Sequence, residues 1–240
     1  MEDIPTVAYF DSYTPEYSTD GLDQVADAIN RYGKADCTLV DIGCGTGKSL
    51  AFLKSQTGLK RLIGIDVSSN CLAKAKERSD CDALRGSILD PNFVDCIVQR
   101  FDFALLAAVL HHLIGRTRTE SRQLAQQALT NSLRLLKPGG ILLVMEPTYY
   151  PSCTMDIVFW IKKAVTTVTS NRVAIGSYWN NIGAPVVSYY TTEGLQRMIR
   201  EAGDTEIIGC ERVAQKLNWI HTAAMITRQE ETTHIVRKRA

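Results

Sequence analysis

The sequence predicts an α/β protein built on a doubly wound, mostly parallel sheet. Three observations lead to this prediction: short apolar runs alternate with segments of helical periodicity, a glycine-rich turn follows the first apolar run, and proline and glycine punctuate a later connection. The chain has 240 residues, 45% of them hydrophobic, which is enough to bury the core of one domain. We therefore expect residues 1–240 to form a single domain.

In the first part of the chain, segments with helical periodicity alternate with short apolar runs. A helix over 21–32 precedes two short apolar runs, at 38–42 and 61–65, which are typical of buried parallel strands. A helix from Lys48 to about Gly58 joins the two runs. The three elements therefore predict a β-α-β unit.

The middle of the chain continues this alternation. Ser68 or Ser69 can cap the next helix through a side-chain oxygen, and residues 83–90 form a third segment after it. A helix near 93–98 then leads into 101–108, an almost uninterrupted apolar run. Such a run predicts a central strand that is covered on both faces.

The last elements are a helix, a strand, a second helix and a hairpin. The helix over 120–136 ends at Lys137-Pro138-Gly139-Gly140, because proline and two glycines prevent its continuation, and a strand follows at 141–145. A helix over 191–202 begins at a capping threonine. Two strand-like segments, which we expect to pair at one sheet edge, lie at 206–210 and 218–226.

The most informative residues are Asp41-Ile42-Gly43-Cys44-Gly45-Thr46-Gly47, followed later by Asp66 at the end of the second strand. Alternate glycines let the backbone turn sharply and let a ligand approach the main chain. A dinucleotide fingerprint requires glycine at position 48, where the chain has Lys48, and a P-loop requires it at position 42, where the chain has Ile42. The spacing fits Asp-x-Gly-x-Gly-x-Gly instead.

This pattern resembles the first motif of the class I S-adenosylmethionine-dependent methyltransferases, small-molecule type. Three further features in the family's order are similar: Asp66, the segment 101–113 that contains His111 and His112, and the segment 133–140. The resemblance covers about residues 39–147. It implies a three-layer sandwich around a seven-stranded sheet of order 3-2-1-4-5-7-6, with the last hairpin antiparallel.

The resemblance also implies that S-adenosylmethionine is the cofactor. Asp41 would lie beside its ammonium and sulfonium end, and Asp66 would accept hydrogen bonds from both ribose hydroxyls. In many members an acidic residue stands where this chain has Ser87. The residues implied to bind the cofactor are Asp41, Gly43, Cys44, Gly45, Gly47, Asp66, Val67, Ser87, Ile88 and Ala107.

Methyl transfer by in-line displacement requires alignment and exclusion of water, and no metal is expected. A hydroxyl, phenol or acidic-carbon acceptor would also need a base. His111 and His112 follow the fourth strand at the ligand end of the sheet, so they are the candidate catalytic residues. The alternative is that the pair orders the loop and touches the cofactor. We expect His221 to be packed within an edge strand.

Two segments are expected to shape the acceptor site. Residues 1–20 are rich in aromatics and, by the resemblance, would form a lid, the alternative being a loosely ordered tail. Residues 148–188 are far longer than an ordinary connection, which predicts an inserted substrate-cap region. The candidate acceptor-binding residues of the two segments are Tyr13, Tyr17, Tyr149, Tyr150, Trp160, Tyr178 and Trp179.

A helix predicted over 155–168 is apolar on more than one face. Its second face could line a pocket for a lipophilic or aromatic acceptor, form a homodimer contact, or belong to the core. The sequence leaves these three possibilities open.

Charge and cysteine content narrow the choice of partners. The net charge of +1, from 27 basic and 26 acidic residues, does not favour nucleic acid or stable membrane insertion. The basic residues Arg237, Lys238 and Arg239 suggest a solvated end. Seven cysteines without metal-binding spacing are typical of reduced thiols, and with no leader or spanning run they predict a cytoplasmic protein that acts on a small molecule.

Two other functions stay open. A P-loop-like nucleotide hydrolase would use Lys48 and Ser49, but it also needs an acid at the end of a partner strand to hold magnesium, and the run at 101–108 ends without one. A non-catalytic S-adenosylmethionine-binding or partner-binding protein could keep the same sheet. It would bind the cofactor without turnover.

Overall fold

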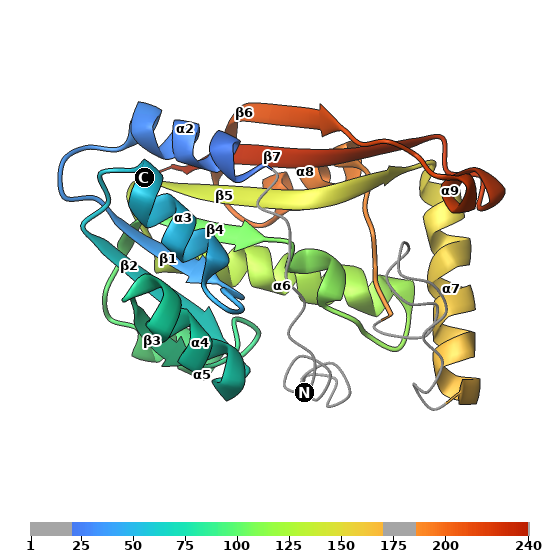
Figure 1. Cartoon of the computed structure of the whole chain (residues 1–240), viewed down its shortest axis with the longest axis horizontal. Helices are drawn as coiled ribbons and strands as arrows, with labels where there is room; N and C mark the ends of the chain where they lie inside the picture. Colours follow the sequence, from blue (N-terminus) through green and yellow to red (C-terminus); the bar gives the residue numbers. More distant parts are fainter. Residues whose placement is uncertain (1–20, 170–185, 240) are drawn as a thin grey trace.

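The computed structural model describes residues 21–169 and 186–239, and the structural statements below concern these residues. One seven-stranded sheet runs through the molecule in the order β3-β2-β1-β4-β5-β7-β6 (Figure 1). The predicted doubly wound α/β fold and its strand order are confirmed. The strands are β1 (Thr38–Ile42), β2 (Arg61–Asp66), β3 (Asp82–Arg85), β4 (Phe101–Ala107), β5 (Leu136–Tyr150), β6 (Thr205–Ala214) and β7 (Arg228–Lys238).

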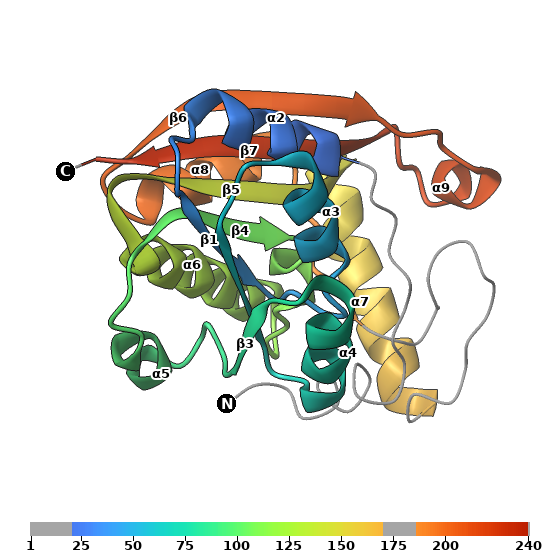
Figure 2. The same ribbon diagram turned by 60° about the vertical axis from the view of Figure 1, so that its left-hand side comes forward.

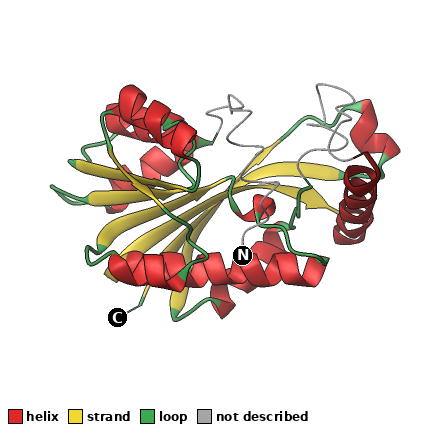
Figure 3. Ribbon diagram, turned by 90° about the horizontal axis from the view of Figure 1, so that it is seen from below, coloured by secondary structure: helices red, strands yellow, loops and turns green. Residues whose placement is uncertain are grey.

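The strands from β1 to β5 pair in parallel, whereas β7 is antiparallel to both of its neighbours, β5 and β6. Helices cover both faces of the sheet (Figure 3). The described helices are α2 (Leu22–Tyr32), α3 (Lys48–Gln56), α4 (Ser69–Ser79), α5 (Pro91–Cys96), the 3-10 turn η1 (Leu110–His112), α6 (Arg118–Leu135), α7 (Ser152–Thr169), α8 (Thr192–Glu201) and α9 (Trp219–Ala223).

Side-chain caps define where several helices begin. Ser68 accepts a hydrogen bond from the backbone N–H of Cys71 at the start of α4, and Thr191 does the same for Gly194 at the start of α8. Both caps agree with the sequence prediction. α6 begins at a third cap, Thr117, and ends at Leu135, before the predicted proline and glycine stop.

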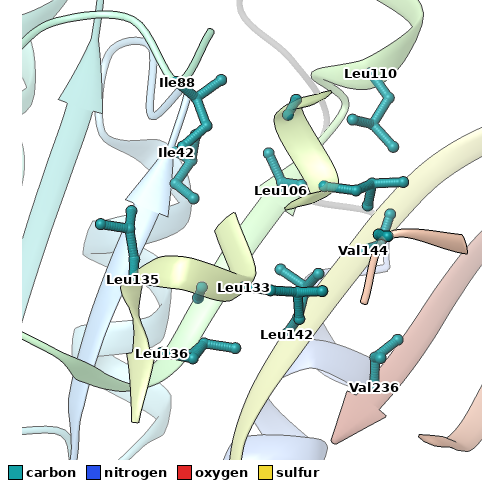
Figure 4. Close-up of a cluster of buried hydrophobic side chains, with 14 of the residues drawn as sticks. Ile42, Ile88, Leu106, Leu110, Leu133, Leu135, Leu136, Leu142, Val144 and Val236 are labelled. Carbon is teal, nitrogen blue, oxygen red and sulfur yellow. The ribbon is translucent and has the colours of Figure 1, made fainter. Parts of the chain in front are cut away.

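The core lies on both faces of the central strands. In β4, Phe103 and Leu105 pack under α2, α3 and α4, which follow one another along one side of the molecule (Figure 2). Leu106 faces the opposite cluster, under α6 and α8, where it lies with Leu142 of β5 and Val236 of β7 (Figure 4). The prediction that 101–108 is a central, doubly covered strand is confirmed.

The predicted strand at 218–226 is wrong. This segment contains the short helix α9, and the seventh strand is β7, whose sequence is mostly polar. β7 is a strand because it is hydrogen-bonded on both sides, to β5 and β6, which buries polar residues such as Thr232 and His234 completely. Local hydrophobicity therefore gave no signal for β7.

Because the seventh strand lies later in the chain than predicted, two smaller expectations are also wrong. Arg237 and Lys238 belong to β7 and are not a frayed tail. His221 lies in α9 and not in a strand, although it is buried as expected, and its Nδ1 accepts a hydrogen bond from the backbone of Asn218.

β5 is much longer than the predicted 141–145 and runs on to Tyr150. It begins with a bulge between Leu136 and Ile141, where the glycine turn of the predicted stop lies. α7 starts just after β5, at the end of the sheet to which the arrow of β5 points (Figure 1). The first residues of the expected cap region over 148–188 are thus the last residues of β5. Residues 170–185 of this region, and the expected lid over 1–20, lie outside the described residues.

Within the described ranges, no helix has the combination of length and hydropathy that spanning a bilayer requires. All seven cysteines are free thiols.

Candidate active site

The glycines in the turn after β1 are needed for two different physical reasons. Gly43, Gly45 and Gly47 all have positive φ angles, of 74°, 52° and 74°. A Cβ on Gly43 would lie 2.7 Å from Cγ2 of Val109, and a Cβ on Gly47 would lie 2.8 Å from the Cα of Ala75. These two glycines are therefore required by close packing within the protein.

Gly45 is the exception in this turn. A Cβ added there would meet no atom within 4 Å, so the turn is open on this side. The sequence argument that glycine leaves room for a ligand applies in the structure to Gly45 alone. Its N–H donates to Oδ2 of Asp66, 2.9 Å away, which fixes the open turn against the end of β2.

Asp66 is held in a defined orientation. Besides Gly45, its other carboxylate oxygen accepts a hydrogen bond of 2.9 Å from the N–H of Ser68. These two bonds orient the carboxylate, and a carboxylate is the type of group that accepts hydrogen bonds from ribose hydroxyls. The residue is half-buried, as a group that both packs and binds would be.

The surroundings of Asp41 also test whether the cofactor fits this site. The carboxyl is almost completely buried, and its Oδ2 accepts a 2.5 Å hydrogen bond from Ser49. Burial raises the pKa of Asp41 to about 7. Its Oδ1 has no hydrogen-bond partner among the described residues, which is costly for a buried oxygen. A cationic ammonium group would compensate both the orphaned oxygen and the charge, so these residues fit the cofactor.

The carboxyl ends of β2, β1 and β4 meet at one edge of the sheet, because these strands are parallel neighbours. This brings the glycine turn, Asp66 with the adjacent Val67, and Ala107 together at that edge. Cys44 lies on the inner side of the turn, since its Sγ would be 2.6 Å from a Cβ on Gly64 of β2.

The third segment is arranged less simply. The Ser87 hydroxyl accepts a hydrogen bond from the N–H of Leu89, and Asp90 caps α5 through the N–H of Asn92. The Ile88 side chain is buried in the core beside Ile42 (Figure 4). Ile88 therefore resembles Cys44 in that its side chain packs into the core.

The loop after β4 is anchored by a residue that the sequence analysis missed. Glu146 of β5 is completely buried, and its Oε1 accepts hydrogen bonds from the N–H groups of Val109 and Leu110, at 2.7 and 2.6 Å. Its Oε2 lies 2.6 Å from Nδ1 of His111. The available signal was a carboxylate directly after the apolar run 141–145. One buried carboxyl therefore orders three consecutive residues.

Burial determines the charges around this loop. It raises the pKa of Glu146 to about 8 and lowers that of His111 to about 3. The pKa of His112 is also lowered well below its usual range, first by burial and then by His111 and Lys162. Lys162 of α7 is itself buried, which lowers its pKa to about 8. The two histidines are therefore neutral at neutral pH.

Aromatic rings surround His111. The Tyr189 ring stacks on it with centroids 5.3 Å apart, and the Tyr149 ring lies 4.3 Å from Tyr189. The backbone N–H of Ser188 donates to the carbonyl of His111, at 2.8 Å. The end of β5 and residues 186–190 thus form the surroundings of the histidine loop.

The predicted aromatic residues have different locations. Tyr149 belongs to the group around His111, whereas the Tyr150 hydroxyl donates to Glu193 of α8 and its ring lies under Arg228. Trp160 is 51% exposed and contacts Phe159 edge to face. The others, Tyr13, Tyr17, Tyr178 and Trp179, lie outside the described residues.

Arg118 is a second residue that the sequence analysis missed. Its buried guanidinium donates to Asp156 of α7, to the Ser188 hydroxyl and to the Tyr189 carbonyl. It also lies 5.3 Å from the centroid of the Tyr190 ring. Arg118 thereby ties α6, α7 and residues 188–190 together, and no local sequence signal indicated this.

Comparison with known proteins agrees with the geometry. A family model described as a methyltransferase domain matches residues 40–144. The chain is similar to a putative methyltransferase of Encephalitozoon cuniculi, with 27% identity over 182 residues that cover 74% of the chain and 73% of the relative. It is also similar to a probable methyltransferase of Aspergillus luteorubrus, with 32% identity over 138 residues that cover 52% of the chain and 46% of the relative.

Among solved structures, the fold is similar to that of the N-methyltransferase NodS from Bradyrhizobium japonicum in complex with S-adenosyl-L-homocysteine. The TM-score is 0.61 at 16% identity, and the alignment covers 98% of this chain and 100% of that one. At this identity, the likeness concerns the fold alone.

Proposed function

The chain belongs to the class I S-adenosylmethionine-dependent methyltransferases, and from this membership we propose that it methylates a small, lipophilic or aromatic acceptor. The enzyme's cofactor is S-adenosylmethionine. The observation that carries the proposed acceptor class is the aromatic group of His111, Tyr149 and Tyr189 beside the cofactor turn. Val109, in the same loop as His111, packs directly on Gly43 of that turn.

The cofactor supplies an activated methyl group on a sulfonium sulfur, so the protein has to orient an acceptor and exclude water. Asp41 would face the ammonium end, Asp66 the ribose, and the open side of Gly45 the body of the cofactor. The remaining predicted contacts, at Gly43, Cys44, Gly47, Val67, Ser87, Ile88 and Ala107, would act through the backbone or by shape.

On the acceptor side, the buried rings of Tyr149 and Tyr189 would favour a flat or apolar molecule. His111 and His112 would be the groups within reach of the reacting atoms. We retain Tyr13, Tyr17, Tyr178 and Trp179 as predicted acceptor contacts from the lid and cap segments.

The two alternatives are not favoured. A nucleotide hydrolase would need the Ser49 hydroxyl for magnesium, but this hydroxyl donates to buried Asp41. Among the described residues, no group of three or more potential ligands is placed to hold a metal ion. The similarity to proteins named as methyltransferases favours an enzyme over a non-catalytic binding protein.

Calorimetry tests the cofactor site. We expect the wild-type protein to bind S-adenosylhomocysteine and not ATP with magnesium, and Asp66→Ala to lose most of this binding. Asp82→Ala is the matched control, because Asp82 is an exposed carboxylate on the neighbouring β3 that pairs with Arg61. Binding of ATP, or equal losses in the two variants, would contradict the proposal.

A methylation screen with mass detection tests the acceptor class. Phenols, aromatic amines, peptides and short RNAs are offered with S-adenosylmethionine, and a methyl group is expected on a small aromatic molecule. Methylation confined to peptide or RNA would overturn the small-molecule part of the proposal.

A homodimer contact is a further possibility that one observation favours. Ile157, Trp160 and Ile161 share one face of α7 and are 51%, 51% and 56% exposed, while Val158 and Phe159 on the other face are buried. Analytical ultracentrifugation tests it: a monomer at all concentrations would assign this face another role.

A further inference from the structure

We propose that Glu146 and His111 form a carboxyl–imidazole pair that receives the acceptor's proton, and that the acceptor is therefore an oxygen acid such as a phenol or enol. This inference rests on the proposed methyl transfer. In it, His111 touches the acceptor and is catalytic, whereas Glu146 acts through His111 and is a positioning residue.

The geometry of the pair determines which nitrogen of His111 carries the hydrogen. Because Oε1 of Glu146 accepts two backbone N–H groups, it can only act as an acceptor there. Oε2 faces Nδ1 of His111 at 2.6 Å. When the carboxyl is ionised, Nδ1 must carry the hydrogen, which leaves Nε2 with a lone pair. A carboxylate that fixes a histidine tautomer in this way makes the other nitrogen a proton acceptor.

Of the two side chains, only that of His111 retains exposed surface. The Glu146 side chain has no exposed surface, and the His111 side chain retains 7%. A ligand can therefore reach this pair only through the imidazole. The ring is also held in place by Tyr189, which stacks on one side, and by His112, whose ring centroid is 4.0 Å away.

His111 belongs to the loop that packs on the glycine turn. The two backbone N–H groups that Glu146 binds belong to Val109 and Leu110, and Val109 packs on Gly43 of the cofactor turn. The position of the imidazole relative to the methyl-donor site is thus set by one carboxyl. A second anchor lies behind it, because the Glu146 carbonyl accepts a hydrogen bond from Thr232 of β7.

The acceptor class follows from the chemistry of such a pair. A neutral amine can attack before losing its proton and a thiol ionises readily, so neither needs a built base. A phenol or enol is a much better nucleophile after losing its proton. In the step, the acceptor oxygen forms the new O–CH₃ bond as the C–S bond breaks, sulfur keeps the electron pair, and the O–H proton moves to Nε2 of His111. Glu146 stabilises the resulting imidazolium.

The pair also predicts how the rate depends on pH. Burial raises the pKa of Glu146 to about 8, so below that pH the pair already holds the proton that the reaction would deliver. The proton-accepting form therefore increases as the pH rises through about 8. Among the described residues, the titratable groups that interact electrostatically with the pair are His112 on η1, Lys162 on α7, and the buried Tyr189 and Tyr190.

The first experiment uses the whole protein without any ligand. Nitrogen-15 NMR of labelled histidine rings is recorded across the pH range, with His111→Asn to assign the resonances. Above the transition, His111 is expected to carry its hydrogen on Nδ1, and Glu146→Gln should abolish the transition. A hydrogen on Nε2 at every pH, or an unchanged titration in Glu146→Gln, would overturn the proposal.

The second experiment measures pH profiles of turnover with a phenolic acceptor. Glu146→Gln should lower kcat by at least about tenfold and remove the rising limb, and His111→Asn should lower kcat by about 10²- to 10⁴-fold. Glu146→Asp should restore part of the rate. Glu230→Gln is the matched control, the same change at a buried glutamate on β7.

Two readouts separate this inference from the function on which it rests. Binding of S-adenosylhomocysteine should stay within about twofold in Glu146→Gln, and circular dichroism should show the variant folded. If the wild type transfers methyl groups while Glu146→Gln and His111→Asn keep its rate and profile, only this inference fails. If Lys162→Gln removes the rising limb of the pH profile and Glu146→Gln keeps it, the limb reports ionisation of Lys162, and the inference also fails.

Discussion

The two sides of the site are built in different ways. The proposed cofactor side consists of the glycine turn with Asp41 and Asp66, where hydrogen bonds from backbone N–H groups orient the Asp66 carboxylate. The proposed acceptor side combines η1, the end of β5, α7 and residues 186–190, which are held by the buried side chains of Glu146 and Arg118. Motif spacing encodes the first side, whereas only the folded chain brings the second together.

The largest expected effect distinguishes two glycines of the same turn. Gly47→Ala combines a positive φ with a clash against the backbone of Ala75, so it should lower the free energy of unfolding by about 2 to 5 kcal/mol. Gly45→Ala meets open space and should cost only about 1 to 2 kcal/mol. Urea unfolding measures both. Equal losses would show that the turn is not divided between packing and ligand access.

A smaller effect is expected at Asp66. Asp66→Ala should weaken S-adenosylhomocysteine binding by roughly 1.5 to 3 kcal/mol, because charge-assisted hydrogen bonds to the ribose are lost. Calorimetry measures the change, and Tyr149→Phe serves as the comparison on the acceptor side. Unchanged affinity in Asp66→Ala would remove this residue from the cofactor site.

Asp41 predicts a pH effect of about tenfold. Its pKa is raised from 3.8 to about 7, so the carboxyl of the free protein is protonated below pH 7 and ionises above it. A cationic ligand prefers the ionised form, so affinity should rise by about tenfold between about pH 6 and about pH 8. Without ligand, the same shift makes the protein lose stability as the pH rises from 3.8 through about 7.

Calorimetry at several pH values measures this dependence. Asp41→Asn keeps the shape and removes the charge, so it should bind more weakly and with a flat profile. A pH-dependent affinity that survives in Asp41→Asn would assign the ionisation to another group.

The smallest effect is expected at Trp160, on the exposed face of α7. Trp160→Ser should change the free energy of unfolding by less than about 1 kcal/mol, because half of the side chain is already exposed. Acceptor KM is the second readout. A large rise in the KM for the acceptor would indicate that Trp160 contacts the acceptor, as the sequence analysis predicted.

The fold could be predicted from those elements whose own residues are apolar or form a recognisable helix cap. β1, β2 and β4 are apolar runs, and Ser68 and Thr191 are recognisable caps. β7 could not be predicted in this way, because its threonines and His234 are buried only by the strands on either side of it.

The candidate site divides similarly. Asp41, Gly45 and Asp66 could be identified from spacing, since their partners lie within one β-α-β unit. Glu146 and Arg118 could not, because their partners are distant in sequence and the bonds depend on tertiary packing. His111 was predicted as a candidate catalytic residue, but the Glu146 carboxyl that contacts it was not predicted.

The two outer strands of the sheet determine how copies of the chain can associate. β3 is only 4 residues long and carries charge at Asp82 and Arg85, while β6 has a bulge between Ile207 and Gly209 and exposes Glu211 and Arg212. Short length, charge and irregular pairing all prevent one sheet from adding strands to another. These features of β3 and β6 therefore disfavour hydrogen bonding between the outer strands of two enzyme molecules.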